Sequence, residues 1–365
     1  MNEIVTGDWI VRLRAESHPR EVALEISTAC NLSCVHCFRK SAVRFNEGHM
    51  EMDIFRRVLR NVVSAGVRRV ALTGWGEPST HPEIEEIIRI CRKHGLQVVL
   101  NTNGFRLLEL SRVIAENVDE LALSIDAPTV ELYSKIRVGG DLPSVLNGLR
   151  ELFRFKRVGG STRPYVKLLF TVNRVNASEA GRLLALAREA GVNEVVYSYY
   201  VPLSREDDLD CLSDSECVKL FEGSVSRVKG EIPELSVRIS MPSYPAGIQR
   251  VCPFASSRTL FIRYDGLVSP CIYYSRTWKT GLFGISRRIH EVVLGDAASE
   301  PLTEIWRGRY SRMFYKLSFS KMPSCLVCKL VDYCDRTRSN ESDCLGNTPT
   351  CGHCPFYHGL THCPL

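Results

Sequence analysis

The segment Cys30-Asn-Leu-Ser-Cys34-Val-His-Cys37 directly follows a run of strand-forming residues, Glu21-Val-Ala-Leu-Glu-Ile-Ser27. Thiolates at this C-x3-C-x2-C spacing suit three irons of a [4Fe–4S] cube, so the fourth iron is left free to bind a small molecule through nitrogen and oxygen atoms. Two other interpretations are a zinc site, with His36 or His49 as a further ligand, and thiols that are simply buried.

From Glu21 to about Tyr200, short apolar segments alternate with amphipathic ones, and this alternation predicts a parallel sheet built from strand–helix units. The expected strands are Val22–Ser27, Arg69–Thr73, Gln97–Thr102, Glu120–Ser124, Val166–Val172 and Glu194–Tyr199. The expected helices are Asp53–Ala65, Pro82–His94, Leu107–Asn117, Leu142–Lys156 and Ala177–Ala190. Gly66, Gly95 and Gly191 stand just after three of these helices, where a helix commonly ends. The fold class is therefore α/β.

With His36 placed just before the third cysteine, the cysteine run resembles the signature of the radical S-adenosylmethionine (SAM) superfamily. The resemblance implies a partial (β/α)6 TIM-like barrel with its active site at the carboxyl ends of the strands. It also implies that Cys30, Cys34 and Cys37 are catalytic and hold a [4Fe–4S] cluster whose open iron binds the amino and carboxylate groups of SAM. Reductive cleavage of SAM then gives methionine and a 5′-deoxyadenosyl radical, which removes hydrogen from a substrate.

Polar residues at the ends of the later strands resemble the SAM-binding segments of that superfamily. Gly74-Trp75-Gly76-Glu77-Pro78 is similar to a Gly-Gly-Glu-Pro segment, with Trp75 at one glycine position, and is expected to hold the SAM ammonium group. Ser124 or Asp126 is expected at the ribose hydroxyls and Arg137 at the carboxylate. The expected SAM contacts are Gly74, Trp75, Gly76, Glu77, Asn101, Asn103, Ser124, Asp126 and Arg137. Singly, each of these residues is also typical of a turn, a helix cap or the surface.

The last third of the chain is rich in cysteine: Cys252, Cys271, Cys325, Cys328, Cys334, Cys344, Cys351, Cys354 and Cys363. Asp265-Gly266 within this region predicts a hairpin turn. The C-x2-C-x5-C run from Cys325 resembles the SPASM domain, which implies two auxiliary [4Fe–4S] clusters; one or two zinc ribbons are the alternative.

The spacing departs from the usual SPASM pattern in two places. No cysteine lies between Cys252 and Cys271, and the cysteine after Cys334 comes only at Cys344. We expect Cys252, Cys271, Cys344 and one of the last three cysteines in one cluster. The other cluster is expected to take Cys325, Cys328, Cys334 and Cys354. A cluster with fewer than four cysteines would have an open iron for substrate.

The other cysteines have no ligand-like spacing. Cys91 lies on the apolar face of a predicted helix and is assigned to the core. Cys211 and Cys217 are assigned structural roles. The chain has 15 cysteines, and in a cytoplasmic protein such a content favours metal over disulfides, with hyperthermophile cytoplasm as the exception.

Composition excludes several other classes of function. The net charge of +6, from 47 basic and 41 acidic residues, is too small and too dispersed for a nucleic-acid-binding surface. No apolar run approaches the roughly 20 residues of a membrane span. The first residues, Met1-Asn-Glu-Ile-Val-Thr-Gly-Asp8, lack the features of a secretory signal, so we expect a cytoplasmic protein without nucleic-acid or membrane partners.

We expect a barrel domain at 1–200, a linker with one helix at 201–250, and an auxiliary cluster domain at 251–365. The tail from Asn340 to Pro364 resembles a subfamily of cofactor-modifying proteins for tungsten-containing aldehyde ferredoxin oxidoreductases. The resemblance implies maturation of a tungstopterin oxidoreductase, acting on a pterin-type cofactor, a peptide or a protein, with reduced ferredoxin or flavodoxin as electron donor. Two alternatives are a maturase that oxidises or cross-links a peptide or protein unrelated to tungsten, and a zinc- or cluster-bearing binding protein without catalysis.

Overall fold

The computed structural model describes residues 3–12, 18–231, 236–246, 251–310 and 322–362. Its main sheet is made of β3 (Glu21–Leu24), β4 (Arg69–Leu72), β5 (Gln97–Thr102), β6 (Glu120–Ser124), β7 (Tyr165–Val172), β8 (Glu194–Tyr199), β9 (Arg238–Ser240), β10 (Thr259–Ile262), β11 (Leu267–Ser269) and β14 (Gly295–Asp296). The strand order is β14-β11-β10-β3-β4-β5-β6-β7-β8-β9. Strands β10 to β9 in this order run parallel, whereas β11 and β14 join antiparallel at one edge.

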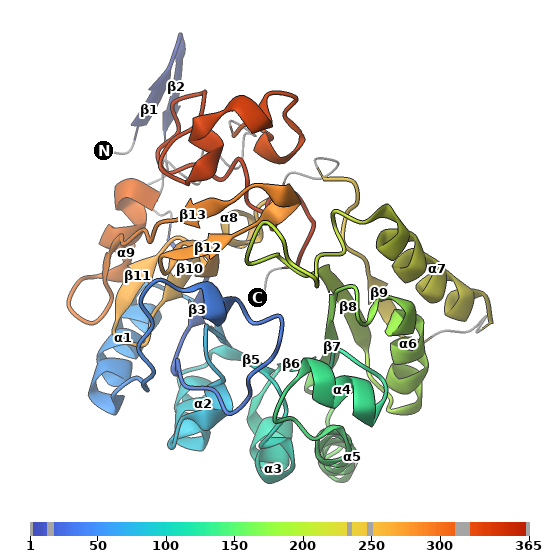
Figure 1. Cartoon of the computed structure of the whole chain (residues 1–365). Coiled ribbons are helices and arrows are strands. Elements are labelled where there is room, and N and C mark those ends of the chain that lie inside the picture. Colours follow the sequence, from blue (N-terminus) through green and yellow to red (C-terminus); the bar gives the residue numbers. More distant parts are fainter. Residues whose placement is uncertain (1–2, 13–17, 232–235, 247–250, 311–321, 363–365) are drawn as a thin grey trace.

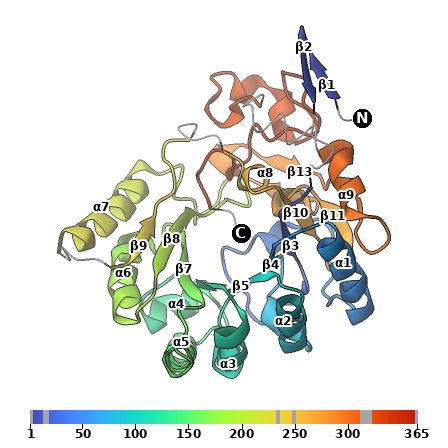
Figure 2. The same ribbon diagram turned by 180° about the vertical axis from the view of Figure 1, so that it is seen from behind.

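Helices cover the outer side of the curved sheet (Figures 1 and 2). They are α1 (Met52–Ser64), α2 (Ile84–Lys93), α3 (Leu107–Asn117), α4 (Val130–Ile136), α5 (Leu142–Val158), α6 (Ala180–Glu189) and α7 (Ser215–Glu231). Each amphipathic helix buries its apolar stripe; α2, for example, buries Ile84, Ile87, Ile88 and Cys91. The sequence thus correctly predicted an α/β partial barrel and placed Cys91 in its core.

The structure adds elements that the sequence pattern did not reveal. Helix α4 and strand β9 were not predicted, and β9 falls within residues 201–250, where only a helix was expected. Strand β10 pairs with the first barrel strand, with Leu260 opposite Val22. One sheet therefore takes strands from all three of the ranges that we expected as separate units.

The cysteine-rich part lies over the open side of the barrel (orange to red in Figure 1). It contains the predicted hairpin, in which β10 and β11 pair around Asp265-Gly266. A second hairpin is formed by β12 (Trp278–Thr280) and β13 (Arg287–Ile289). Trp75 from the barrel packs with Phe254, Tyr273 and Trp278 in a hydrophobic cluster that joins the two parts.

A separate hairpin of β1 (Glu3–Thr6) and β2 (Trp9–Arg12) projects beside the cysteine-rich part (Figures 1 and 2). It pairs with no other strand of the described residues. Its Trp9 side chain is exposed. None of the helices in the described ranges combines the length and the apolar character that crossing a membrane requires.

Candidate active site

A cavity of about 730 Å³ opens inside the barrel at the carboxyl ends of the strands. Cys30, Cys34 and Cys37 line one side of it. The expected SAM contacts that also line it are Gly74, Trp75, Gly76, Glu77, Asn101, Asn103, Ser124 and Arg137. Residues from five separate strand ends and loops thus meet at one site, whereas the side chain of Asp126 is fully buried behind the wall.

The cysteine loop is fixed to the barrel through its backbone. Ser33 N–H donates to Val138 O, and Val35 N–H donates to Ile136 O, both at 2.9 Å. Burial raises the pKa of Cys34 to about 11 although Arg137 acts against this, and burial likewise raises the pKa of Cys30. These thiols also act on each other electrostatically, so they ionise together only near a strong positive charge such as bound iron. This donor set fits an iron–sulfur cluster.

The turn after β4 is tied to this loop. Glu77 N–H donates to Ala29 O at 2.8 Å. A Cβ atom on Gly76 would lie 2.5 Å from the backbone carbon of Thr28, so only glycine permits this approach. The carboxylate of Glu77 accepts hydrogen bonds from Thr102 Oγ1 at 2.5 Å and from Asn103 N–H at 2.7 Å. Glu77 therefore positions the strand ends, and the backbone of the turn faces the cavity.

A buried ion pair, Arg137 with Asp126, lies at the opposite side of the cysteine loop. Arg137 Nη2 lies 2.6 Å from Asp126 Oδ2, and Thr171 N–H donates to Asp126 Oδ1 at 2.6 Å. Burial lowers the pKa of His36 to about 4, so His36 is neutral when it contacts Asp126. Burial opposes the charge of Arg137, but Asp126 and Cys34 outweigh this and raise its pKa. Arg137 is thus a permanent cation at the cavity, whereas Asp126 is its partner.

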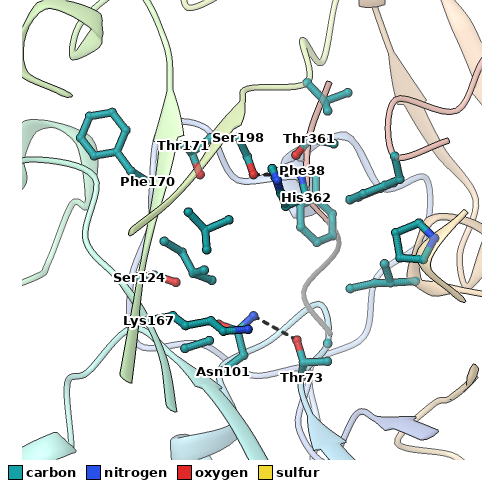
Figure 3. A pocket seen from close by; sticks show the side chains of 18 of the residues that line it. Phe38, Thr73, Asn101, Ser124, Lys167, Phe170, Thr171, Ser198, Thr361 and His362 are labelled. Carbon is teal, nitrogen blue, oxygen red and sulfur yellow. Dashed lines mark hydrogen bonds between the residues drawn. The ribbon is translucent and has the colours of Figure 1, made fainter. Parts of the chain in front are cut away.

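The inner part of the cavity is lined by polar side chains that the sequence analysis did not single out (Figure 3). Thr171 and Ser198 project from neighbouring strands, and Lys167 is paired with Glu120 at 2.7 Å. Their signal in the sequence is a polar residue on one face of a strand that is otherwise apolar, as at Lys167 and Thr171 of β7. The cavity therefore offers hydroxyl groups and paired charges.

The chain returns to the barrel after its last described cysteine. Tyr199 N–H donates to Leu360 O at 3.0 Å, and Ser243 N–H donates to Gly359 O at 2.7 Å. His362 N–H donates to Ser198 Oγ at 2.9 Å, so His362 enters the cavity wall next to Ser198 (Figure 3). No local pattern in the sequence indicated this return.

The C-terminal cysteines gather in two groups. The inner cysteine group consists of Cys252, Cys271, Cys351 and Cys354, whose charges act on one another and whose pKa values are all raised, mainly by burial. Two of the cavity-lining residues, Tyr273 and Phe356, stand next to it in the sequence and in the same hydrophobic cluster. The inner cysteine group is thus close to the cavity.

The outer cysteine group consists of Cys325, Cys328, Cys334 and Cys344. Cys344 and Cys328 act electrostatically on Cys325, and Cys334 ends the adjoining turn. Cys328 and Cys344 are exposed.

This grouping differs from the expected one, which placed Cys344 with Cys252 and Cys271, and Cys354 with Cys325. Cys325 N–H donates to Gly352 O at 2.8 Å, so the turn between Cys351 and Cys354 packs against Cys325. Cys363 lies outside the described residues. Cys211 and Cys217, expected to be structural, form a disulfide.

Comparison with known protein families agrees with this geometry. Residues 24–166 match the radical SAM superfamily, and residues 252–329 match the SPASM iron–sulfur cluster-binding domain. The chain thus contains a radical SAM domain and a SPASM domain, and it is a radical SAM enzyme whose domains imply iron–sulfur clusters and SAM.

Among curated proteins, the chain is similar to a tungsten-containing aldehyde ferredoxin oxidoreductase cofactor-modifying protein of Pyrococcus furiosus. The two are 27% identical over 94% of this chain and 96% of the relative. It is also 25% identical to an AdoMet-dependent heme synthase of Methanosarcina barkeri, over 92% and 97% of the two chains.

Solved structures share the fold. The anSMEcpe protein with bound AdoMet matches with a TM-score of 0.65 at 18% identity, over 93% of this chain and 95% of that one. Streptococcus suis SuiB bound to S-adenosylmethionine matches with a TM-score of 0.61 at 18% identity, over 87% and 72%.

Proposed function

We propose that this enzyme cleaves SAM reductively to a 5′-deoxyadenosyl radical and uses the radical to mature a tungstopterin oxidoreductase. The observation that carries the proposal is the meeting of Cys30, Cys34 and Cys37 with the Gly74–Glu77 turn and Arg137 around one cavity. The tungsten context is supported by the similarity to the Pyrococcus furiosus protein along almost the whole chain. The substrate is a pterin-type cofactor, or a peptide or protein segment of the oxidoreductase.

Cys30, Cys34 and Cys37 would hold the cluster that reacts with SAM. When bound, a [4Fe–4S] cluster with three protein ligands supplies an open iron for SAM and the electron for its cleavage. Arg137 is the permanent cation beside Cys34 and would meet the SAM carboxylate. The Gly74–Glu77 backbone would receive the ammonium group, with Asn101, Asn103 and Ser124 along the nucleoside. Asp126 takes part through Arg137, since its side chain is fully buried.

The remaining wall of the cavity would hold the substrate. Its inner charges are already paired, as in Lys167 with Glu120 and Arg69 with Glu21 at 3.0 Å. Hydroxyl groups of Thr73, Thr171 and Ser198 remain to accept or donate hydrogen bonds. Such a wall favours a polar group with little net charge at the reacting position.

The inner and outer cysteine groups would each hold an auxiliary [4Fe–4S] cluster with four thiolates. Three clusters correspond to about 12 iron atoms per chain. The inner group, beside the cavity, suits electron exchange with the substrate. The outer group suits exchange with a cytoplasmic carrier, reduced ferredoxin or flavodoxin, because Cys328 and Cys344 are exposed there with Val327, Leu330 and Tyr333.

The proposal is tested with protein reconstituted anaerobically with iron and sulfide. The triple variant Cys30→Ala, Cys34→Ala, Cys37→Ala should lose 5′-deoxyadenosine formation under dithionite and keep about eight iron atoms. The control variant Cys325→Ala, Cys328→Ala should keep uncoupled SAM cleavage, with folding checked by circular dichroism.

Continued 5′-deoxyadenosine formation by the triple variant would contradict the site assignment. About four iron atoms with two zinc ions in the wild type would favour a zinc ribbon in the C-terminal region. To identify the substrate, an aldehyde oxidoreductase partner is incubated with the enzyme and SAM. Mass spectrometry then examines its pterin and its peptides for modification. A modified peptide with no tungsten partner would favour a general peptide maturase.

A further inference from the structure

Arg287 is a buried cation at the centre of the cysteine-rich part. It begins β13, and only 2% of its surface is exposed. Its Nη1 donates to Leu282 O at 2.7 Å and to Ile285 O at 3.3 Å. Its Nε and Nη2 atoms are buried and have no hydrogen-bond partner, and no carboxylate of the described ranges pairs with it. A buried charge without a counter-charge is strongly unfavourable, so an anion is expected beside it.

Arg287 interacts with Tyr273, with Cys325 of the outer cysteine group and with the like charge of Arg338. Burial lowers its pKa, while Tyr273 and Cys325 act in the opposite direction. Tyr273 in turn interacts with Cys354, Cys271 and Cys351. The next residue, Arg288, forms a β-bridge with Ser339, which follows Cys334 in the chain, so Arg287 lies near the outer cysteine group.

The two cysteine groups approach each other closely at this point. A Cβ atom on Gly352 would lie 2.7 Å from Cys325 Sγ, so the turn between Cys351 and Cys354 packs directly on a ligand of the outer group. Arg287 and Cys325 are both buried. Thiolates and inorganic sulfides are the anions that a cluster bound here would supply.

We propose that Arg287 is the buried counter-charge of the outer auxiliary cluster: its Nε–H and Nη2–H groups donate to the sulfur ligands held by the outer cysteine group and raise the reduction potential of that cluster. The inference rests on the proposed cluster ligation by Cys325, Cys328, Cys334 and Cys344. Reduction adds one electron and makes the cluster more negative. A nearby cation and N–H donors stabilise this more negative state, so they raise the reduction potential. Arg287 is a positioning residue and touches no substrate.

The opposite influence comes from Asp343, whose negative charge acts on Cys325. Its carboxylate is buried and accepts hydrogen bonds from Asn347 N–H at 3.0 Å and Thr350 Oγ1 at 2.6 Å. Cys325 therefore stands between one buried cation and one buried anion. Removal of either charge should move the potential of the outer cluster, and the two shifts should have opposite signs.

The test is a redox titration of the anaerobically reconstituted full chain, followed by electron paramagnetic resonance without SAM or substrate. The signal of the outer cluster is identified by its absence from the Cys344→Ala variant. In Arg287→Gln this signal should titrate at a more negative potential than in the wild type, and Arg287→Lys should give a smaller shift. The matched control is Arg288→Gln, because Arg288 is exposed on the same strand and should leave the potential unchanged.

An unchanged potential in fully loaded Arg287→Gln, or an equal shift in Arg288→Gln, would overturn the proposal. If Arg287→Gln fails to load the outer cluster while Arg287→Lys loads it, the requirement for a positive charge is supported. Failure of both variants to load would contradict a role based on charge, because lysine retains the charge. The readout requires no SAM cleavage, so it is independent of the proposed reaction.

Discussion

Arg276 forms a buried two-point ion pair with Glu25, joining the cysteine-rich part to the residue that directly follows the first barrel strand. Arg276 Nη1 donates to Glu25 Oε1 at 2.9 Å, and Nη2 pairs with Oε2. The same Oε1 accepts a hydrogen bond from Trp75 N–H at 2.8 Å. One carboxylate therefore fixes both the inter-part contact and the turn that lines the cavity.

Replacement of the Glu25 carboxylate should destabilise the protein. In Glu25→Gln, Arg276 keeps a buried charge with no anionic partner, which should lower the free energy of unfolding by about 3–5 kcal/mol. Anaerobic thermal denaturation of the reconstituted protein measures the loss. The control is Glu116→Gln, which breaks an exposed pair with Arg112 on α3 and should cost about 0.5 kcal/mol or less. Equal melting temperatures for the two variants would show that the buried ion pair contributes no more to stability than the exposed one.

Iron content distinguishes the observed cysteine groups from the grouping expected by spacing. Cys252→Ala, Cys354→Ala removes two ligands of the inner group and should cost about four iron atoms per chain. Cys252→Ala, Cys344→Ala removes one ligand from each group and should damage both clusters. Elemental analysis with Mössbauer spectroscopy compares the two variants. Damage to both clusters in the first variant, and to one cluster in the second, would support the grouping expected from the spacing of the cysteines.

Gly76 should be required for SAM binding. In Gly76→Ala the new Cβ would meet the backbone of Ser27, Thr28 and Ala29 at 2.5–2.6 Å, so the turn and the cysteine loop must separate. Isothermal titration with SAM should show an affinity loss of at least about tenfold, which corresponds to about 1.4 kcal/mol. The control is Gly223→Ala on α7, where a Cβ meets nothing within 4 Å and should add helix stability. If Gly76→Ala binds SAM with wild-type affinity, the turn is not part of the SAM-binding site.

Acidification should destabilise the protein through a buried histidine. Burial lowers the pKa of His353 to about 4, whereas an unfolded histidine titrates near 6.5. Between these values only the unfolded chain binds the proton, so stability is complete above about pH 6.5 and falls as the pH drops toward 4. At pH 5.5 the loss is about 1 kcal/mol. Melting temperatures at pH 7.5 and 5.5 should differ less in His353→Gln than in the wild type; an equal difference would exclude His353 as the cause.

The sequence predicted the barrel because its strands and helices have strong, distinct periodicities. The strands Gln97–Thr102 and Glu120–Ser124 occur with the predicted bounds. The short α4, Val130–Ile136, was missed because seven residues give little periodic signal. Strand β10 was placed in a hairpin, but its pairing with β3 depends on a contact between segments far apart in the sequence, which local patterns do not report.

The candidate site was predictable where a short motif carries it. The cysteine run and the strand-end polar residues meet at one cavity as expected, with Asp126 behind the wall. The membership of Cys344 and Cys354 in their groups was not predictable from spacing, because it depends on how the loops pack together, as where Cys325 N–H bonds to Gly352 O. Arg287 and His362 were also missed, since neither stands in a motif and both acquire their surroundings through the return of the C-terminal residues.

The pairing of β3 with β10 has a consequence for synthesis on the ribosome. The edge of Glu21–Leu24 that Thr259–Ile262 will cover stays open while the intervening residues are made, which takes on the order of ten seconds or more at about 5–20 residues per second. An uncovered parallel edge is a template for pairing with other nascent chains. Slow translation before residue 259 should therefore promote aggregation, and a host with chaperones that bind nascent chains should improve the yield of folded enzyme.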